Sequence, residues 1–213
     1  MSYAICATML VANCSNAQVH SSTHISFEAD SLKHWETRSF AGETDYSIVE
    51  LDDQHVLRAQ SKMSASAIAL ELPVDITQTP YLNWRWRVEN TFGLEHDEQS
   101  KDGDDYPARL YVVVSDGYQP WEVIALNYVW SSNQSVGTTW SSAWTNKAKM
   151  IAVESGDSSA GQWVVEKRNL LEDFHALFDR DVTTIKAVAI MVDSDNHGGS
   201  ATSYFGDIFF STE

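Results

Sequence analysis

Residues 193–198 form the segment of the sequence that most resembles a cation-binding loop. Asp193 and Asp195 stand at alternate positions, and a glycine comes sixth, as in the first half of a calcium loop. The twelfth position is Tyr204 and no flanking helices are expected, so the segment is not an EF-hand. A calcium site here would recruit ligands from elsewhere in the chain; the alternative is a tight turn capped by its own Asp and Asn side chains. The candidate metal ligands are Asp193, Asp195, Asn196, Asp207, Asp104 and Asp105.

A second acidic stretch places three carboxylates within four residues, at Asp102, Asp104 and Asp105. Such groups repel one another unless a cation, an arginine or backbone donors compensate them. One interpretation is a solvated loop with an ion pair between Asp105 and Arg109 or between Asp104 and Arg85. The other is that these carboxylates meet the later acidic loop and act as a glycosidase pair, for which the sequence does not fix the separation.

Aromatic residues are dense between positions 121 and 144, and flat rings of this kind stack on the apolar faces of sugars. Trp140 and Trp144 lie in a polar segment, where they either contact a ligand or fold back onto the edge of the protein. The candidate ligand-binding residues are Trp121, Trp130, Trp140, Trp144 and Arg109.

Motifs of nucleophilic or metal-dependent hydrolases are absent from the sequence. It contains no Gly-x-Ser-x-Gly, no phosphate-binding loop and no His-Glu-x-x-His, and its seven histidines are scattered. We therefore assign no catalytic residue.

Short stretches with alternating apolar and polar residues predict an all-β fold. In residues 81–88, Leu82, Trp84, Trp86 and Val88 share one face, as in a half-buried strand. Further strands are expected at 55–60, 67–72, 109–115, 122–130, 150–154, 162–167, 185–192 and 203–210, separated by turns rich in Gly, Asp, Asn and Ser. This pattern predicts a two-sheet antiparallel β-sandwich of the jelly-roll type.

One segment has helical spacing. Apolar residues recur from Leu170 to Phe178, and Asn169 stands before them as an N-cap. We expect one short amphipathic helix over the end of the sandwich.

The first residues read as a signal peptide over 1–17, followed by a single β-sandwich domain over 18–213. An apolar run at 3–12 precedes Ser15 and Ala17, which satisfy the small-x-small cleavage rule, although no Lys or Arg precedes the run. A lipid anchor on Cys14 is disfavoured by the preceding Asn13. Both cysteines lie in this segment, so the processed chain would have none.

The net charge of −16, from 30 acidic and 14 basic residues, repels phosphate backbones and anionic membrane surfaces. Nucleic acid is therefore excluded as an expected partner. The sequence has no apolar run of the ~18 residues that a membrane span requires.

Several motifs follow one another in the second half of the chain: residues 102–105 with 108–111, then 162–164, 168–169, 172–174, 189–196 and 204–209. As an ordered set they resemble the DUF3047 family of bacterial proteins, with His197 where the family pattern usually has Thr. The resemblance implies export and a fold similar to galactose-binding and carbohydrate-binding jelly rolls, and it implies no activity.

These observations lead to three functional hypotheses. The first is an exported cell-envelope protein, periplasmic or secreted, that is non-catalytic and binds a glycan or polysaccharide, with a structural calcium ion. The alternative is a polysaccharide-active enzyme, a glycoside hydrolase or lyase, that uses the loop carboxylates. The third is an interaction module that binds an envelope protein through a flat apolar patch.

Overall fold

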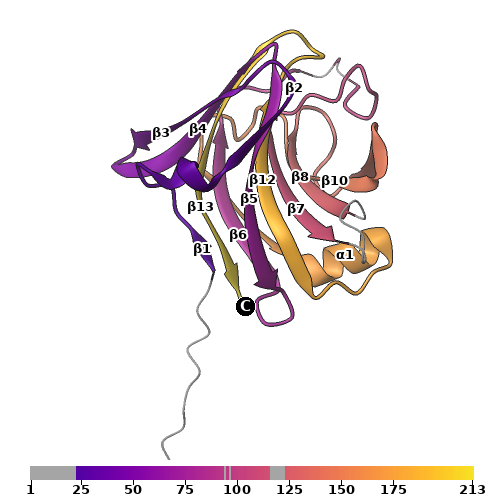
Figure 1. Ribbon diagram of the computed structural model, residues 1–213. Helices are drawn as coiled ribbons and strands as arrows, with labels where there is room; N and C mark the ends of the chain where they lie inside the picture. Colours follow the sequence, from indigo (N-terminus) through magenta and orange to yellow (C-terminus); the bar gives the residue numbers. More distant parts are fainter. Residues whose placement is uncertain (1–22, 94, 96, 116–122) are drawn as a thin grey trace, which may run out of the picture.

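The computed structural model describes residues 23–93, 95, 97–115 and 123–213 (Figure 1). The strands are β1 (His24–Ile25), β2 (Glu36–Ala41), β3 (Asp45–Leu51), β4 (Gln54–Lys62), β5 (Ala65–Asp75), β6 (Tyr81–Val88), β7 (Ala108–Ser115), β8 (Val123–Ser131), β9 (Thr139–Ser142), β10 (Thr145–Ser155), β11 (Val164–Asn169), β12 (Thr184–Asp193) and β13 (Ser200–Ser211). The helices are a 3-10 turn at Ser31–His34 and the α-helix α1 at Leu170–Phe178. No helix among these residues is long and apolar enough to span a membrane. The predicted signal peptide and Trp121 lie outside the described residues.

The strands form two sheets that pack as a sandwich. The six-stranded sheet has the order β11-β6-β13-β4-β3, with β1 added beside β13, and the seven-stranded sheet has the order β2-β5-β12-β7-β8-β10-β9. The predicted two-sheet β-sandwich is confirmed. One pairing departs from the antiparallel prediction, because β10 runs parallel to β8. Parallel strands need a longer connection than a hairpin, and here that connection contains β9.

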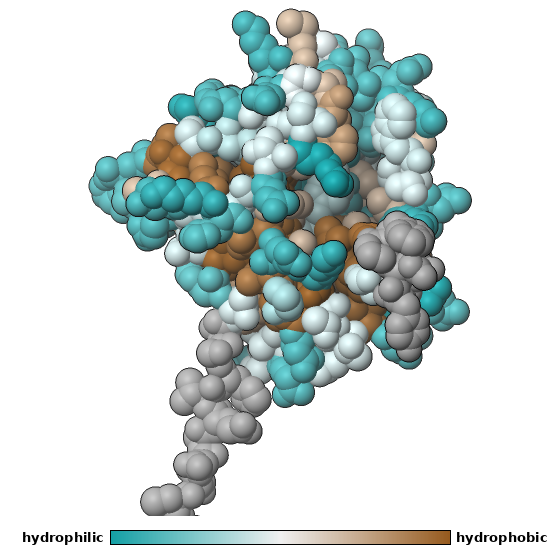
Figure 2. All heavy atoms as spheres, in the orientation of Figure 1, coloured by the Kyte–Doolittle hydropathy of each residue, from teal (hydrophilic) through white to brown (hydrophobic). Residues whose placement is uncertain are grey.

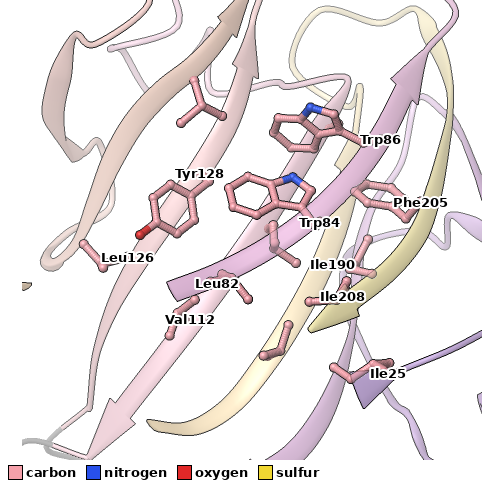
Figure 3. Close-up of a cluster of buried hydrophobic side chains, with 14 of the residues drawn as sticks. Ile25, Leu82, Trp84, Trp86, Val112, Leu126, Tyr128, Ile190, Phe205 and Ile208 are labelled. Carbon is pink, nitrogen blue, oxygen red and sulfur yellow. The ribbon is translucent and has the colours of Figure 1, made fainter. Parts of the chain in front are cut away.

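Large apolar side chains from both sheets fill the space between them. Trp84 and Trp86 on β6 point toward Tyr128 on β8 (Figure 3). The ring centroids of Trp84 and Tyr128 are 5.2 Å apart, and those of Trp86 and Trp130 are 6.0 Å apart. Trp130 is fully buried, and its indole N–H donates to the carbonyl of Gly156 at 3.0 Å. The prediction that Trp130 contacts a ligand is therefore wrong, because its ring belongs to the core.

Helix α1 lies at one end of the sandwich and is tied to the core by a buried carboxylate (Figure 1). The side chain of Asn169 accepts from the backbone N–H groups of Leu171 and Glu172, which confirms the predicted N-cap. Asp173 accepts from the hydroxyl of Tyr128 at 2.7 Å and from Nε of Arg168 at 3.0 Å. The helix is thus fixed both by its cap and by a bond that reaches into the sandwich.

Candidate functional site

On the outer face of the seven-stranded sheet, two neighbouring strands carry small side chains, so the surface of the protein is depressed there. Ala67 and Ala69 on β5 lie beside Ala187 and Ala189 on β12, with Ala189 directly opposite Ala69. Side chains alternate between the two faces of a strand, so their neighbours Ile68, Val188 and Ile190 point into the core and are buried. The two central strands therefore present a floor of alanines to the outside.

Larger side chains rise on both sides of this floor and make it a groove of about 1180 Å³. Phe40 on β2, which is 64% exposed, stands on one side, and Tyr111 on β7 stands on the other. On the face drawn in Figure 2, hydrophobic surface lies recessed between hydrophilic side chains. The groove is lined by His34, Glu36, Thr37, Arg38, Phe40, Ala67, Ala69, Leu70, Glu71, Tyr111, Val113, Val123, Lys186, Ala187, Ala189 and Met191.

Four charged side chains line the groove: Glu36, Arg38, Glu71 and Lys186. Within the described part of the chain, none of the four has a side-chain hydrogen bond or ion pair, whereas Arg58, Arg87 and Arg168 are each paired with a carboxylate. The groove therefore offers two carboxylates and two cations to a ligand.

The other half of the same outer face is covered by the segment that precedes β7. Tyr106 is fully buried there against Val129 and Met150, and its hydroxyl donates to the carbonyl of Glu98 at 2.6 Å. The Glu98 side chain is also fully buried and accepts from the Ser131 hydroxyl and the Ser132 backbone N–H. Burial raises the pKa of Glu98. This cover ends at Arg109, and the open groove begins beside it at Tyr111.

Two predicted acidic loops meet at the end of the groove. Carboxylate oxygens of Asp105, Asp193 and Asp195 all lie within 4.8 Å of one another, and we call these three residues the carboxylate cluster. Asp105 accepts from the backbone N–H of Asn196 at 3.2 Å, from its side-chain amide at 3.4 Å, and from the N–H of His197. The cluster has the oxygen chemistry that calcium prefers, and the calcium site stays a prediction.

Arg109 lies beneath the carboxylate cluster, and its guanidinium group binds other groups of the protein. Its Nε donates to Asp193 at 2.9 Å, and its terminal nitrogens contact Asp193, the backbone and carboxylate of Asp104, and the hydroxyl of Tyr111. The residue is 3% exposed. The prediction that Arg109 binds a ligand is corrected: its guanidinium is engaged by internal partners. The alternative pairing of Asp104 with Arg85 is also wrong, because Arg85 lies over the ring of Trp163.

The electrostatics of the cluster follow from its burial. Removal from water raises the pKa of Asp193, the bonded Arg109 opposes that increase, and the carboxylates of Asp105 and Asp104 add to it. The pKa of Asp195 is also raised, by burial and by the neighbouring Asp105. Carboxylates so close together need a proton, a cation or strong donors to remain side by side.

The two loop tryptophans occupy different environments. Trp140 is half-buried, and its ring stacks on that of Tyr106 with centroids 6.3 Å apart. Trp144 is 61% exposed, and its indole N–H donates to the carboxylate of Asp104 at 3.0 Å. Of these two tryptophans, Trp144 is the one that presents an open aromatic surface.

The remaining predicted ligand, Asp207, lies apart from the cluster. It sits on β13 of the six-stranded sheet and contacts His24 at 3.1 Å. The prediction that Asp207 shares a metal site with the loop carboxylates is therefore wrong. The groove residues Phe40 and Tyr111 were not predictable from the sequence, since single aromatic residues on strands carry no signal that separates them from core residues.

The sandwich is similar to known carbohydrate-binding modules. The family 30 carbohydrate-binding module of the cellulosomal cellulase Cel9D-Cel44B of Clostridium thermocellum has a TM-score of 0.53 and 13% identity, over 90% of this chain and 98% of that chain. The family 11 module of Lic26A-Cel5E from the same organism gives a TM-score of 0.44 and 8% identity, over 84% and 87%. These likenesses concern the fold alone.

A glycoside hydrolase domain is also among the similar structures. The Endo-D domain of Streptococcus pneumoniae R6 gives a TM-score of 0.46 and 11% identity over 84% of this chain. This chain spans only 22% of that domain.

The sequence comparisons place the chain in a family. No curated protein sequence matches it. The model of DUF3047, described as a protein of unknown function, matches residues 33–209, as the motifs between 102 and 209 predicted. The chain therefore belongs to the DUF3047 family.

Proposed function

We propose that this protein binds a neutral polysaccharide chain in the groove on the open face of the seven-stranded sheet. The observation that carries the proposal is the groove itself, with its alanine floor between Phe40 and Tyr111. Ligand sites are concave and mostly apolar, with a few polar groups that fix orientation. The similarity of the fold to that of a carbohydrate-binding module also supports glycan binding.

The groove matches the chemistry of a sugar chain. A sugar ring has apolar C–H faces that stack on aromatic side chains, here Phe40 and Tyr111. Its hydroxyls both donate and accept hydrogen bonds. Cations supply donors and carboxylates supply acceptors, and the groove offers two of each without internal partners.

The balance of these charges favours a neutral glycan. A strongly anionic polymer would meet Glu36 and Glu71, and a cationic polymer would meet Arg38 and Lys186. Like charges brought together on binding cost free energy. Neither clash arises with a chain that carries only hydroxyl groups.

The enzyme alternative depended on the loop carboxylates, and their burial argues against it. Asp105 is 0% and Asp193 is 2% exposed, and both accept bonds from internal donors. Asp195, the third carboxylate of the cluster, is half-buried, so one carboxylate is accessible where a glycosidase needs a pair. We therefore favour binding over hydrolysis as the role of this face.

Export to the periplasm or the medium remains part of the proposal, on the strength of the leader-like residues 1–17. Expression of the full chain in a bacterium and N-terminal sequencing of the product tests it. Processing after Ala17 supports export, and a cytoplasmic product that retains the leader contradicts it.

A retention assay tests glycan binding. The protein would be passed over immobilised neutral (xylan, β-1,4-galactan, mixed-linkage β-glucan) and acidic (alginate, pectate) polysaccharides. We expect retention on a neutral polymer, loss of retention in Ala187→Trp, which fills the floor, and weakened retention in Tyr111→Ala. Tyr204→Ala is the matched control, because that half-buried tyrosine lies on β13 in the other sheet. The proposal fails if no neutral polymer is retained, or if folded Ala187→Trp and Tyr111→Ala bind like the native protein.

A further inference from the structure

We infer that Trp144 is a second aromatic contact site that continues the groove, so that the ligand is a polysaccharide chain long enough to cover both. The inference rests on the proposed function and adds to it a site outside the groove lining. It also assigns a positioning role to Asp104. The argument starts from how near Trp144 lies to the groove.

A short chain of contacts joins the two places. The hydroxyl of Tyr111, which lines the groove, is 3.4 Å from Nη1 of Arg109; this nitrogen is 3.5 Å from Oδ2 of Asp104, and this oxygen is 3.0 Å from the indole nitrogen of Trp144. The Tyr111 hydroxyl and the Trp144 nitrogen therefore lie within about 10 Å of each other. Trp144 therefore lies close to the end of the groove that Tyr111 lines.

The exposed ring of Trp144 is held in place rather than left free. Its N–H is bonded to the carboxylate of Asp104, and the ammonium of Lys101 lies 4.9 Å from its ring centroid. Even with Lys101 over the ring, Trp144 is 61% exposed, so aromatic surface remains for a sugar. Fixing a side chain in its bound orientation before the ligand arrives reduces the ordering cost of binding.

Asp104 is in turn held by the buried core of the site. It is 6% exposed, it lies against Arg109, and Arg109 is fixed by Asp193. The rigid ion pairs beneath the surface thus orient Trp144 on one side and contact Tyr111 on the other. This explains why acidic residues with no access to solvent lie beside an open groove.

Trp140 provides the contrast. It is on the same segment of chain, yet it packs on Tyr106 and is half-buried, as expected of a structural residue. Packing does not account for Trp144 in the same way, since most of its surface remains in contact with solvent.

The dependence of affinity on ligand length tests this inference. The probe is a ladder of oligosaccharides prepared from the neutral polysaccharide that the native protein retains, with affinities measured by calorimetry. Native affinity should rise with length until the chain spans the groove and Trp144. Trp144→Ala should bind the short oligosaccharides normally and the long ones about three- to tenfold more weakly, the range expected for loss of one aromatic stacking contact.

Two variants of Asp104 separate positioning from folding. Asp104→Ala removes the acceptor of the indole N–H and should show the same loss, confined to long oligosaccharides. Asp104→Asn keeps a side-chain acceptor and should restore most of the affinity. The inference is overturned if Trp144→Ala binds every length like the native protein, or weakens all lengths equally.

The same measurements distinguish this outcome from failure of the proposed function. If Tyr111→Ala weakens short and long oligosaccharides but Trp144→Ala changes neither, the groove binds glycan and only the second contact site is wrong. If the native protein retains no neutral polysaccharide, both are overturned.

Discussion

Replacement of Arg109 by Met should strongly destabilise the protein. The side chain is 3% exposed and neutralises Asp193, which is 2% exposed, together with Asp104. Methionine keeps much of the volume and removes the charge and every donor. The variant therefore leaves two carboxyl groups buried without their cation.

The expected cost follows from the burial of the partners. Removing one member of a buried, hydrogen-bonded ion pair destabilises a protein by about 3–5 kcal/mol, because the other charge is left uncompensated. For a chain of this size each kcal/mol corresponds to roughly 2–4 °C, so the melting temperature should fall by roughly 6–20 °C. The pKa of Asp193, already raised by burial, should rise further without the guanidinium.

Urea denaturation of three variants provides the measurement. Arg58→Met is the matched control, because Arg58 pairs with exposed Asp45 at 3.3 Å and surface ion pairs contribute about 0–1 kcal/mol. Adding Asp193→Asn to Arg109→Met removes the orphaned carboxylate, so the double variant should be more stable than Arg109→Met alone. A loss in Arg109→Met no larger than in Arg58→Met would refute the reasoning, and would point to another compensating charge, such as a bound cation.

Three further predictions concern single groups. Burial and a nearby carboxylate raise the pKa of Glu166 from 4.5 to about 7. The folded chain therefore binds this proton more tightly than the unfolded chain, and the protein loses stability as pH rises from about 4.5 to about 7. Glu166→Gln should melt at a higher temperature than the native protein at pH 8 and at almost the same temperature at pH 4, and equal melting temperatures at both pH values would count against the raised pKa. Extracellular modules bind calcium with a Kd of about 10⁻⁴–10⁻³ M. If the carboxylate cluster binds calcium in this range, roughly 1 mM calcium should add about 0.4–1.4 kcal/mol to the free energy of unfolding and raise the melting temperature by a few degrees at most. A melting temperature that does not change after chelation and re-addition of calcium would reject an exchangeable site. Asn169→Ala should lower the free energy of unfolding by about 1 kcal/mol, because it removes the N-cap of α1. Asn169→Asp is the conservative control. A urea midpoint of Asn169→Ala like that of the native protein would show that the cap is dispensable.

Strands that bury one face were predictable from the sequence. The predicted strand at 81–88 has the same bounds as β6, because Leu82, Trp84, Trp86 and Val88 are large enough to make the alternation plain. The strands predicted at 109–115 and 185–192 correspond to β7 and β12, which are neighbours in the middle of the seven-stranded sheet. The helix was predictable for the same reason, together with the capping chemistry of Asn169.

Strands that bury little were not predictable. Strand β2 has exposed side chains from Glu36 to Phe40, so it has no apolar period, and it is defined by its pairing with β5. The groove was invisible for a related physical reason. Its floor is made by alanines such as Ala69 and Ala189, and a hollow formed by small side chains has no chemical signature in a sequence.

The carboxylate cluster was not predictable, because the sequence does not reveal the order of the strands in the sheet. Arg109 and Asp193 are 84 residues apart in the sequence, yet Arg109 is the second residue of β7 and Asp193 is the last residue of β12. Because these strands are antiparallel neighbours with Met191 opposite Arg109, the loop before one and the loop after the other must lie at the same edge of the sheet. Asp207, in contrast, lies within β13 of the other sheet, and no turn composition could have excluded it. The acidic residues were identifiable by type, but only the strand order decides which of them share a site.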